Sequence, residues 1–140
     1  MPKKLIFDTD VRREIQECFE QWIAAVTSGR KSAPDDVLVF YAEEASLWAT
    51  FSPERRNTPD LLREYFVRFT GLSGMQADVV ESDILVFDSF AVNRGLYTFS
   101  YEGSGERVSV PARFSFTYIR REEGWRIIEH HSSRVPEPLG

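Results

Sequence analysis

The stretch GWRIIEHHSSRVP, residues 124–136, guides the interpretation of the whole chain. It holds both histidines, His130 and His131, side by side in a run that is typical of a β-strand. Neighbouring side chains of a regular strand point to opposite faces, so the two imidazoles are not expected to bind one ligand or one metal ion together. The alternation predicts Trp125, Ile127, Glu129, His131 and Ser133 on one face and Arg126, Ile128, His130 and Ser132 on the other.

Four long strands are predicted in the second half of the chain, joined mainly by hairpins. Glycine-containing turns at 103–105 and 122–124 separate the last three of these strands. The expected strands cover residues 76–87, 91–102, 106–121 and 125–134.

The first half of the chain is predicted to be mainly helical. Apolar residues recur at three- and four-residue spacing over residues 8–29, which indicates an amphipathic helix. Thr58 followed by Pro59 indicates a helix start, with a capping residue before a proline in the first turn. A short helix over 32–40 and a short strand over 45–51 are expected between these two helices.

Helices at one end of the sequence and an antiparallel meander at the other predict an α+β domain. The sheet is expected to curl around the long first helix, which produces a cone with a mouth. Residues 1–140 are interpreted as a single domain, with a tail from about residue 135.

Composition argues against several classes of partner. The net charge of −5 and the isoelectric point of about 5.1 argue against nucleic acid or an anionic membrane as the main partner. Cys18 is the single cysteine, which excludes an internal disulfide and suits a reducing cytoplasm. The apolar run at 5–7 is too short for a signal peptide or a membrane span. The arginine pair Arg55-Arg56 is expected to be solvated or paired across a subunit contact.

Four motifs spread over nearly the whole chain carry a family resemblance. They are ATFSPE at 49–54, Tyr65-Phe66, Arg120-Arg121 ahead of Gly124-Trp125, and His131-Ser132-Ser133 leading to Pro136. Through them the chain resembles the nuclear-transport-factor-2-like (SnoaL-like cone fold) superfamily. Within it, the chain is most similar to the association (hub) domain of calcium/calmodulin-dependent protein kinase II and to its single-domain relatives, including the SgcJ/EcaC type.

The resemblance implies a cone fold, a cavity and self-association. In the hub domain, arginines in the cavity bind carboxylate ligands, but the two arginine positions fall at Tyr97 and Phe116 in this chain. Anion binding by that arginine pair is therefore not expected here. The 140 residues include no kinase domain, so the resemblance implies no kinase activity.

His130 is the leading candidate for a site residue. A histidine above an aromatic cavity can act as a general base or donate a hydrogen bond to a ligand, because its ordinary pKa lies near 6.5. The alternative is a core histidine that bonds a backbone carbonyl or a tyrosine. The resemblance places Ile128, His130 and Ser132 on the inner face of the sheet, beside Phe114, Phe116 and Tyr118.

Aromatic residues provide the rest of the expected cavity, although aromatic residues at helical or strand spacing also suit an ordinary core. The candidate ligand-binding residues are Trp22, Trp48, Tyr65, Tyr97, Phe116, His130 and Ser132.

A second group is expected on the opposite face of the last strand. Glu129 and His131 lie two residues apart, with Arg113 and Thr117 as cross-strand neighbours. A carboxylate beside a histidine can form an acid/base pair or supply two metal ligands, but a zinc site needs at least three protein ligands and no third one is evident. A hydrogen-bonded network at a subunit interface is therefore favoured, and no metal ion or cofactor is predicted.

The leading hypothesis is a cytoplasmic domain that binds a small organic ligand and forms a homodimer or a larger homo-oligomer. The rival hypothesis is a small cone-fold enzyme (an isomerase, a cyclase or an oxidoreductase-associated protein). It would use His130 as general base, with Tyr65 or Tyr97 orienting the substrate. A third hypothesis is an oligomerisation module that binds no ligand.

Overall fold

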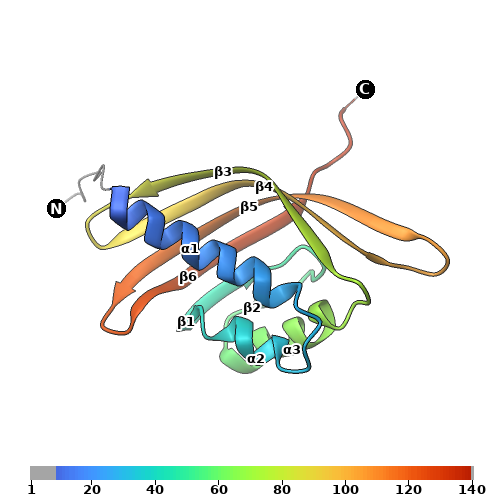
Figure 1. Ribbon diagram of the computed structural model, residues 1–140, viewed down its shortest axis with the longest axis horizontal. Helices are drawn as coiled ribbons and strands as arrows, with labels where there is room; N and C mark the ends of the chain where they lie inside the picture. Colours follow the sequence, from blue (N-terminus) through green and yellow to red (C-terminus); the bar gives the residue numbers. More distant parts are fainter. Residues whose placement is uncertain (1–8, 140) are drawn as a thin grey trace.

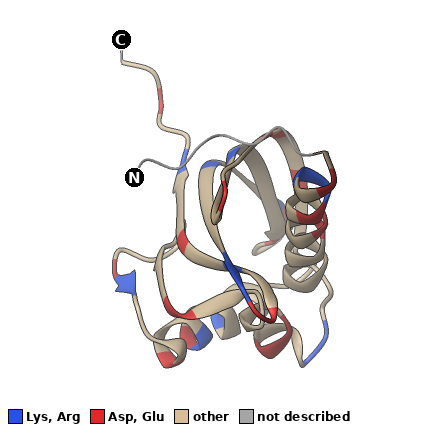
Figure 2. Cartoon of the chain, turned by 90° about the vertical axis from the view of Figure 1, so that its left-hand side faces the viewer, with Lys and Arg blue, Asp and Glu red and all other residues tan. Residues whose placement is uncertain are grey.

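The computed structural model describes residues 9–139, and it shows one curved six-stranded sheet with a long helix packed against its inner face (Figure 1). Figure 2 shows the curvature of the sheet from a view turned by 90°. The elements are α1 (Thr9–Val26), α2 (Ala33–Leu38), β1 (Tyr41–Trp48), β2 (Arg55–Arg56), α3 (Pro59–Thr70), β3 (Gln76–Val86), β4 (Phe90–Glu102), β5 (Arg107–Arg121) and β6 (Gly124–Arg134).

The predicted fold class is confirmed, with one addition to the topology. The strands lie in the order β2-β1-β6-β5-β4-β3, and β3 to β6 form the expected antiparallel meander. The addition is β1, which pairs with β6 in parallel and so makes the sheet mixed. This parallel pairing places residues from the first third of the chain beside the two histidines.

The helices form for the reasons that the sequence indicates. Ile15, Phe19, Trp22 and Val26 form the buried stripe of α1. The predicted helix extended over 8–29, and of that range residue 8 lies outside the described residues. At the start of α3, the hydroxyl of Thr58 accepts a hydrogen bond from the backbone N–H three residues on, at a donor–acceptor distance of 3.2 Å.

The last strand contains a β-bulge that the alternation pattern does not reveal. Tyr118 pairs with Ile127, whereas the preceding residue of β5, Thr117, pairs with Glu129. Ile128 is therefore the extra residue of β6 at this point. A bulge of this kind reverses the relation between residue number and face for everything beyond it.

The bulge corrects the predicted faces of β6. Trp125 and Ile127 are buried before the bulge, and His130 and Ser132 are buried after it. The prediction that Ile128 shares the inner face with His130 is wrong, because the strand is not regular between them. The alternation holds from Glu129 onward, so His130 and His131 do point to opposite faces.

The first strand also differs from the expectation. It was predicted over 45–51 and is found at Tyr41–Trp48, with a register irregularity between Tyr41 and Ser46. That irregularity interrupts the alternation of buried and exposed residues. The first half of the strand therefore lacks the alternation of apolar and polar residues by which a strand is predicted from sequence. The two-residue β2 continues the sheet on the far side of β1.

The expectation that Arg56 is solvated or paired between subunits is wrong. Its side chain is enclosed, with only 6% of the residue exposed. The guanidinium donates to the Glu64 carboxylate at 3.0 Å, to the Ser52 hydroxyl at 3.2 Å and to the Leu61 carbonyl at 3.4 Å. Arg56 therefore fixes the loop before α3 to the helix from within the subunit.

The core lies between the inner face of the sheet and the helices, and it is mainly aromatic. Trp22 of α1 contacts Tyr97 of β4 and Phe116 of β5, with ring centroids 6.3 and 5.2 Å apart. Phe66 and Phe69 of α3 approach the same core from the other side. The space enclosed by α1, α3 and the sheet contains the cavity described below.

Candidate functional site

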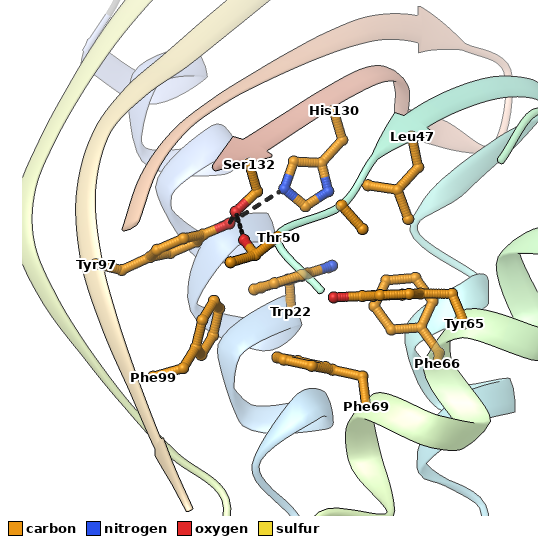
Figure 3. Close-up of a pocket in the computed structure, with 11 residues that line it drawn as sticks. Trp22, Leu47, Thr50, Tyr65, Phe66, Phe69, Tyr97, Phe99, His130 and Ser132 are labelled. Atoms are coloured by element: carbon orange, nitrogen blue, oxygen red, sulfur yellow. Dashed lines mark hydrogen bonds between the residues drawn. The ribbon is translucent and has the colours of Figure 1, made fainter. Parts of the chain in front are cut away.

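A small cavity lies between α1, α3 and the inner face of the sheet (Figure 3). Its volume of about 10 Å³ is close to the minimum that accommodates one water molecule. Aromatic side chains make up much of its wall, and polar groups from β4, β6 and the turn after β1 meet in it. The lining residues are Trp22, Leu47, Ala49, Thr50, Tyr65, Phe66, Phe69, Tyr97, Phe99, His130 and Ser132.

His130 sits at the centre of the polar groups and is 2% exposed. Its ring stacks on Phe116 of the neighbouring strand, with centroids 3.8 Å apart, and meets Trp22 edge-on at 5.5 Å. Burial, with a smaller contribution from the charge of His131, lowers the pKa of His130 from 6.5 to about 3. The imidazole is therefore neutral at physiological pH.

The hydrogen bonds around His130 determine which ring nitrogen carries the proton. The indole N–H of Trp22 can only donate, and it donates to the Tyr41 hydroxyl oxygen at 3.1 Å. That hydroxyl lies 2.9 Å from Nδ1 of His130, and no other acceptor for its hydrogen is found among the described residues. Tyr41 therefore donates to Nδ1, so the proton of the neutral ring is on Nε2.

The chain of hydrogen bonds continues on the other side of the ring. Nε2 of His130 lies 3.3 Å from the Tyr97 hydroxyl oxygen, to which it donates. Tyr97 in turn donates to the Ser132 hydroxyl at 2.6 Å, and Ser132 bonds the hydroxyl of Thr50. Burial raises the pKa of Tyr97 above its ordinary value, so its hydroxyl keeps its proton at neutral pH.

These hydrogen bonds bear on whether His130 can act as a general base. A general base needs an accessible lone pair and a pKa near the working pH. In His130 the lone pair on Nδ1 accepts from Tyr41, and the depressed pKa makes the ring a weak proton acceptor. The geometry favours the hydrogen-bonding role over the base role.

A larger groove adjoins the cavity on the outside. It has a volume of about 220 Å³ and shares Tyr65 and Phe69 with the cavity, so these two stacked rings form a wall common to both spaces. Its other lining residues are Phe51, Ser52, Arg56, Arg68, Leu72 and Tyr101. The groove is large enough for a small organic molecule, whereas the inner cavity holds a single small group.

The structure brings together five of the seven predicted ligand-binding residues. Trp22, Tyr65, Tyr97, His130 and Ser132 all line the inner cavity.

The two others lie elsewhere. Phe116 does not line the cavity but supports His130 from behind by ring stacking. The prediction that Trp48 lines the cavity is wrong, because Trp48 lies at the end of β1 with 41% of its surface exposed. It is paired with His131, which belongs to the outer face of the sheet.

Two members of the polar cluster were not identified from the sequence. Tyr41 was placed between two predicted elements, and the irregularity in β1 removed the pattern that would have shown it to be buried. Thr50 was noted only as part of the family motif at 49–54. Only the parallel pairing of β1 with β6 brings these residues next to His130.

The residues predicted for an interface lie on the outer face of the sheet. Arg113, Glu129 and His131 are exposed and Thr117 is half-buried. Thr117 is directly opposite Glu129 in the β5–β6 pair. These four side chains thus occupy one surface, on the side of the sheet away from α1.

Two absences characterise residues 9–139. No group of three or more histidine, cysteine, aspartate or glutamate side chains in this range is arranged to hold a metal ion. None of the helices in the same range is both long and apolar enough to cross a membrane.

Comparison with known proteins places this geometry in a family. A search of curated proteins found no match. Among solved structures, a protein from Xanthomonas campestris provisionally described as a calcium/calmodulin dependent protein kinase II association domain is 33% identical, with 90% of this chain and 89% of that chain covered and a TM-score of 0.81.

More distant structures share the fold. A nuclear transport factor 2-like superfamily protein from Salmonella enterica is 19% identical, with 94% of this chain and 95% of that chain covered and a TM-score of 0.78. A protein from Novosphingobium aromaticivorans provisionally described as an aromatic ring hydroxylase is 18% identical, with 94% of each chain covered and a TM-score of 0.82. The family model for the calcium/calmodulin dependent protein kinase II association domain matches residues 11–136, so the chain belongs to that family.

Proposed function

We propose that this chain is a self-associating domain that binds a small organic ligand in the groove and cavity beside His130. The observation that carries the proposal is the polar cluster of Tyr41, Thr50, Tyr97, His130 and Ser132 at the inner end of an aromatic space. Small-molecule sites generally combine an apolar wall with a few convergent polar groups. The groove of about 220 Å³ next to this cluster provides the room.

Buried polar groups are also found in ordinary cores, where they are hydrogen-bonded to one another. The position of this cluster favours a binding role, because Thr50 and Ser132 lie at the cavity wall rather than in solid packing. A cavity next to an open groove allows a ligand to reach the cluster if the shared rings of Tyr65 and Phe69 move apart.

Self-association is supported by the family and by the outer face of the sheet. The family is defined by an association domain, and the outer face of β1, β5 and β6 is not covered by the helices (Figure 1). Trp48 exposes a large apolar surface there, next to His131 and near Glu129. An exposed tryptophan bordered by polar residues is typical of protein interfaces.

An experiment on the intact chain tests the self-association. Light scattering at increasing protein concentration is expected to give a mass of at least two subunits, and Trp48→Glu is expected to shift the protein toward the monomer. Val80→Glu is the matched control, because it adds the same charge at another exposed apolar position, on the edge strand β3. A monomer at all concentrations, or equal effects of the two variants, contradicts the proposed surface.

A second experiment tests ligand binding. A fragment screen by thermal shift is expected to find compounds that raise the melting temperature further as their concentration rises. Filling the cavity by Ala49→Leu is expected to abolish these shifts, since Ala49 lines it. If no fragment stabilises the protein, the chain is an assembly module without a ligand.

The rival hypothesis of an enzyme with His130 as general base has less support. The Nδ1 lone pair of His130 accepts a hydrogen bond from Tyr41, and the Nε2 atom carries the proton. Tyr65 and Tyr97, the residues suggested to orient a substrate, do line the cavity. Their presence there suits ligand binding equally well and requires no turnover.

A further inference from the structure

The hydrogen-bond chain around His130 contains one more polar hydrogen than it contains hydrogen bonds. Its six members are Trp22, Tyr41, His130, Tyr97, Ser132 and Thr50, and five hydrogen bonds connect them. Each member carries one polar hydrogen when the imidazole is neutral. The indole of Trp22 can only donate, so the hydrogen bonds run from Trp22 toward the opposite end of the chain. The hydrogen that is left without a bond therefore lies at that opposite end.

That end consists of the hydroxyls of Ser132 and Thr50. Either of the two can donate to the other, and one hydrogen then remains whichever way the bond runs. Both residues line the cavity, and Figure 3 shows the two hydroxyls close together beside Tyr97. The cavity therefore has one hydroxyl donor available for an acceptor atom.

The size of the cavity limits what that acceptor can be. About 10 Å³ admits a group no larger than a water molecule, such as a single carbonyl or ether oxygen. The body of the molecule must then lie in the groove of about 220 Å³, on the other side of Tyr65 and Phe69.

The residues of the cavity wall disfavour a charged ligand group. Its lining residues include no lysine, arginine, aspartate or glutamate, and His130 is neutral. A carboxylate placed there would lose its hydration and gain one neutral hydrogen bond, which is strongly unfavourable. A neutral oxygen loses much less hydration and gains the same bond.

We propose that the ligand of this site is a neutral organic compound whose carbonyl oxygen enters the inner cavity and accepts a hydrogen bond from the Thr50–Ser132 hydroxyl pair. This inference rests on the proposed ligand-binding function and names its ligand class. His130 acts as a positioning residue, because it passes the donor direction from Tyr41 to Tyr97 and donates its own hydrogen to Tyr97 rather than to the ligand oxygen. The arginine side chains of the groove, Arg56 and Arg68, lie outside the cavity and do not contact the carbonyl end.

Three probes with the same ring separate the possibilities: benzamide has a neutral carbonyl, toluene has no acceptor, and benzoate carries a charge. Titrations followed by thermal shift are expected to show benzamide binding roughly threefold to tenfold more tightly than toluene, the effect of one hydrogen bond, and more tightly than benzoate. Toluene or benzoate binding as tightly as benzamide overturns the inference while leaving ligand binding intact. Absence of any shift with all three probes overturns this ligand class, and the fragment screen then decides whether the site binds ligands at all.

Three variants test the named donor. Thr50→Val keeps the shape and removes a hydroxyl, which leaves the remaining hydroxyl hydrogen of Ser132 without its partner oxygen and free for the cavity. The double change Thr50→Val with Ser132→Ala removes both hydroxyls and leaves the Tyr97 hydroxyl, 2.6 Å from the former Ser132 oxygen, as the remaining donor. The preference for benzamide over toluene is therefore expected to fall. Thr50→Ser retains both hydroxyls and is expected to keep the preference. A preference that the double change leaves undiminished overturns the assignment.

The direction of the chain can be measured without a ligand. Nitrogen-15 NMR of the histidine rings at pH 7 is expected to show His130 with a proton on Nε2 and an unprotonated Nδ1 that accepts a hydrogen bond. This measurement remains informative if the double variant fails to fold. A ring protonated on Nδ1 reverses the donor direction and overturns the inference.

Discussion

Acidification tests the buried position of His130 most directly. The folded protein holds the imidazole neutral, with a pKa of about 3, whereas in the unfolded chain the same group titrates near its ordinary value of 6.5. Between these two values the unfolded state binds a proton that the folded state does not. The free energy of unfolding therefore rises with pH across this window and falls as the pH is lowered from 6.5 toward 3.

The magnitude follows from the two pKa values. Each pH unit inside the window changes the free energy of unfolding by about 1.4 kcal/mol for one proton. Lowering the pH from 7 to 4 crosses most of the window, so His130 alone is expected to cost the protein about 3 kcal/mol of stability. That amount is a large fraction of the 5–15 kcal/mol typical of a folded domain.

Urea unfolding at pH 4, 5, 6 and 7 measures the effect, and variants isolate it from the titration of carboxylates. His130→Gln removes the titrating group. When the pH is lowered from 7 to 4, the free energy of unfolding of this variant is expected to fall by about 3 kcal/mol less than that of the wild type. His131→Gln is the control on the opposite face of the same strand, and it retains His130 and is expected to keep the steep dependence. If the wild type and His130→Gln show parallel pH profiles, the imidazole is not held neutral and the hydrogen-bond directions assigned above are wrong.

Three further predictions concern stability and are measured by urea unfolding at pH 7. Tyr41→Phe leaves two buried groups without their partner and is expected to cost about 2–4 kcal/mol, and a cost below 1 kcal/mol contradicts the bridging role of this hydroxyl. Gly95→Ala places a Cβ atom 1.9 Å from the Glu81 carbonyl oxygen at the β3 bulge, so a loss of about 3 kcal/mol is expected and a neutral effect contradicts this backbone approach. Thr58→Ala removes the cap that accepts from the Leu61 N–H and is expected to cost about 1 kcal/mol, whereas no loss means that the cap is dispensable.

Much of the fold follows from local features of the sequence. The Thr58-Pro59 pair marks the start of α3 because a capping hydroxyl and a proline in the first turn act within a single helical turn. The meander of β3 to β6 follows from strands separated by short turns. The opposite faces of His130 and His131 follow from the alternation of the last strand, which is regular from Glu129 onward, whereas the inner face of His130 was indicated only by the family resemblance.

Which residues form the site depends on contacts between parts of the chain that are distant in the sequence. The parallel pairing of β1 with β6 brings Tyr41 and Thr50 to His130, across about ninety and eighty residues respectively. The bulge at Ile128 and the outward turn of Trp48 likewise depend on how strands meet, because pairing register is set by the partner strand as much as by the strand itself. The sequence alone determined most of the elements and the opposite faces of the two histidines, since these depend on neighbours along the chain. Only the tertiary structure decided which hydroxyls surround that histidine and on which nitrogen its proton lies, since both depend on atoms that folding brings together.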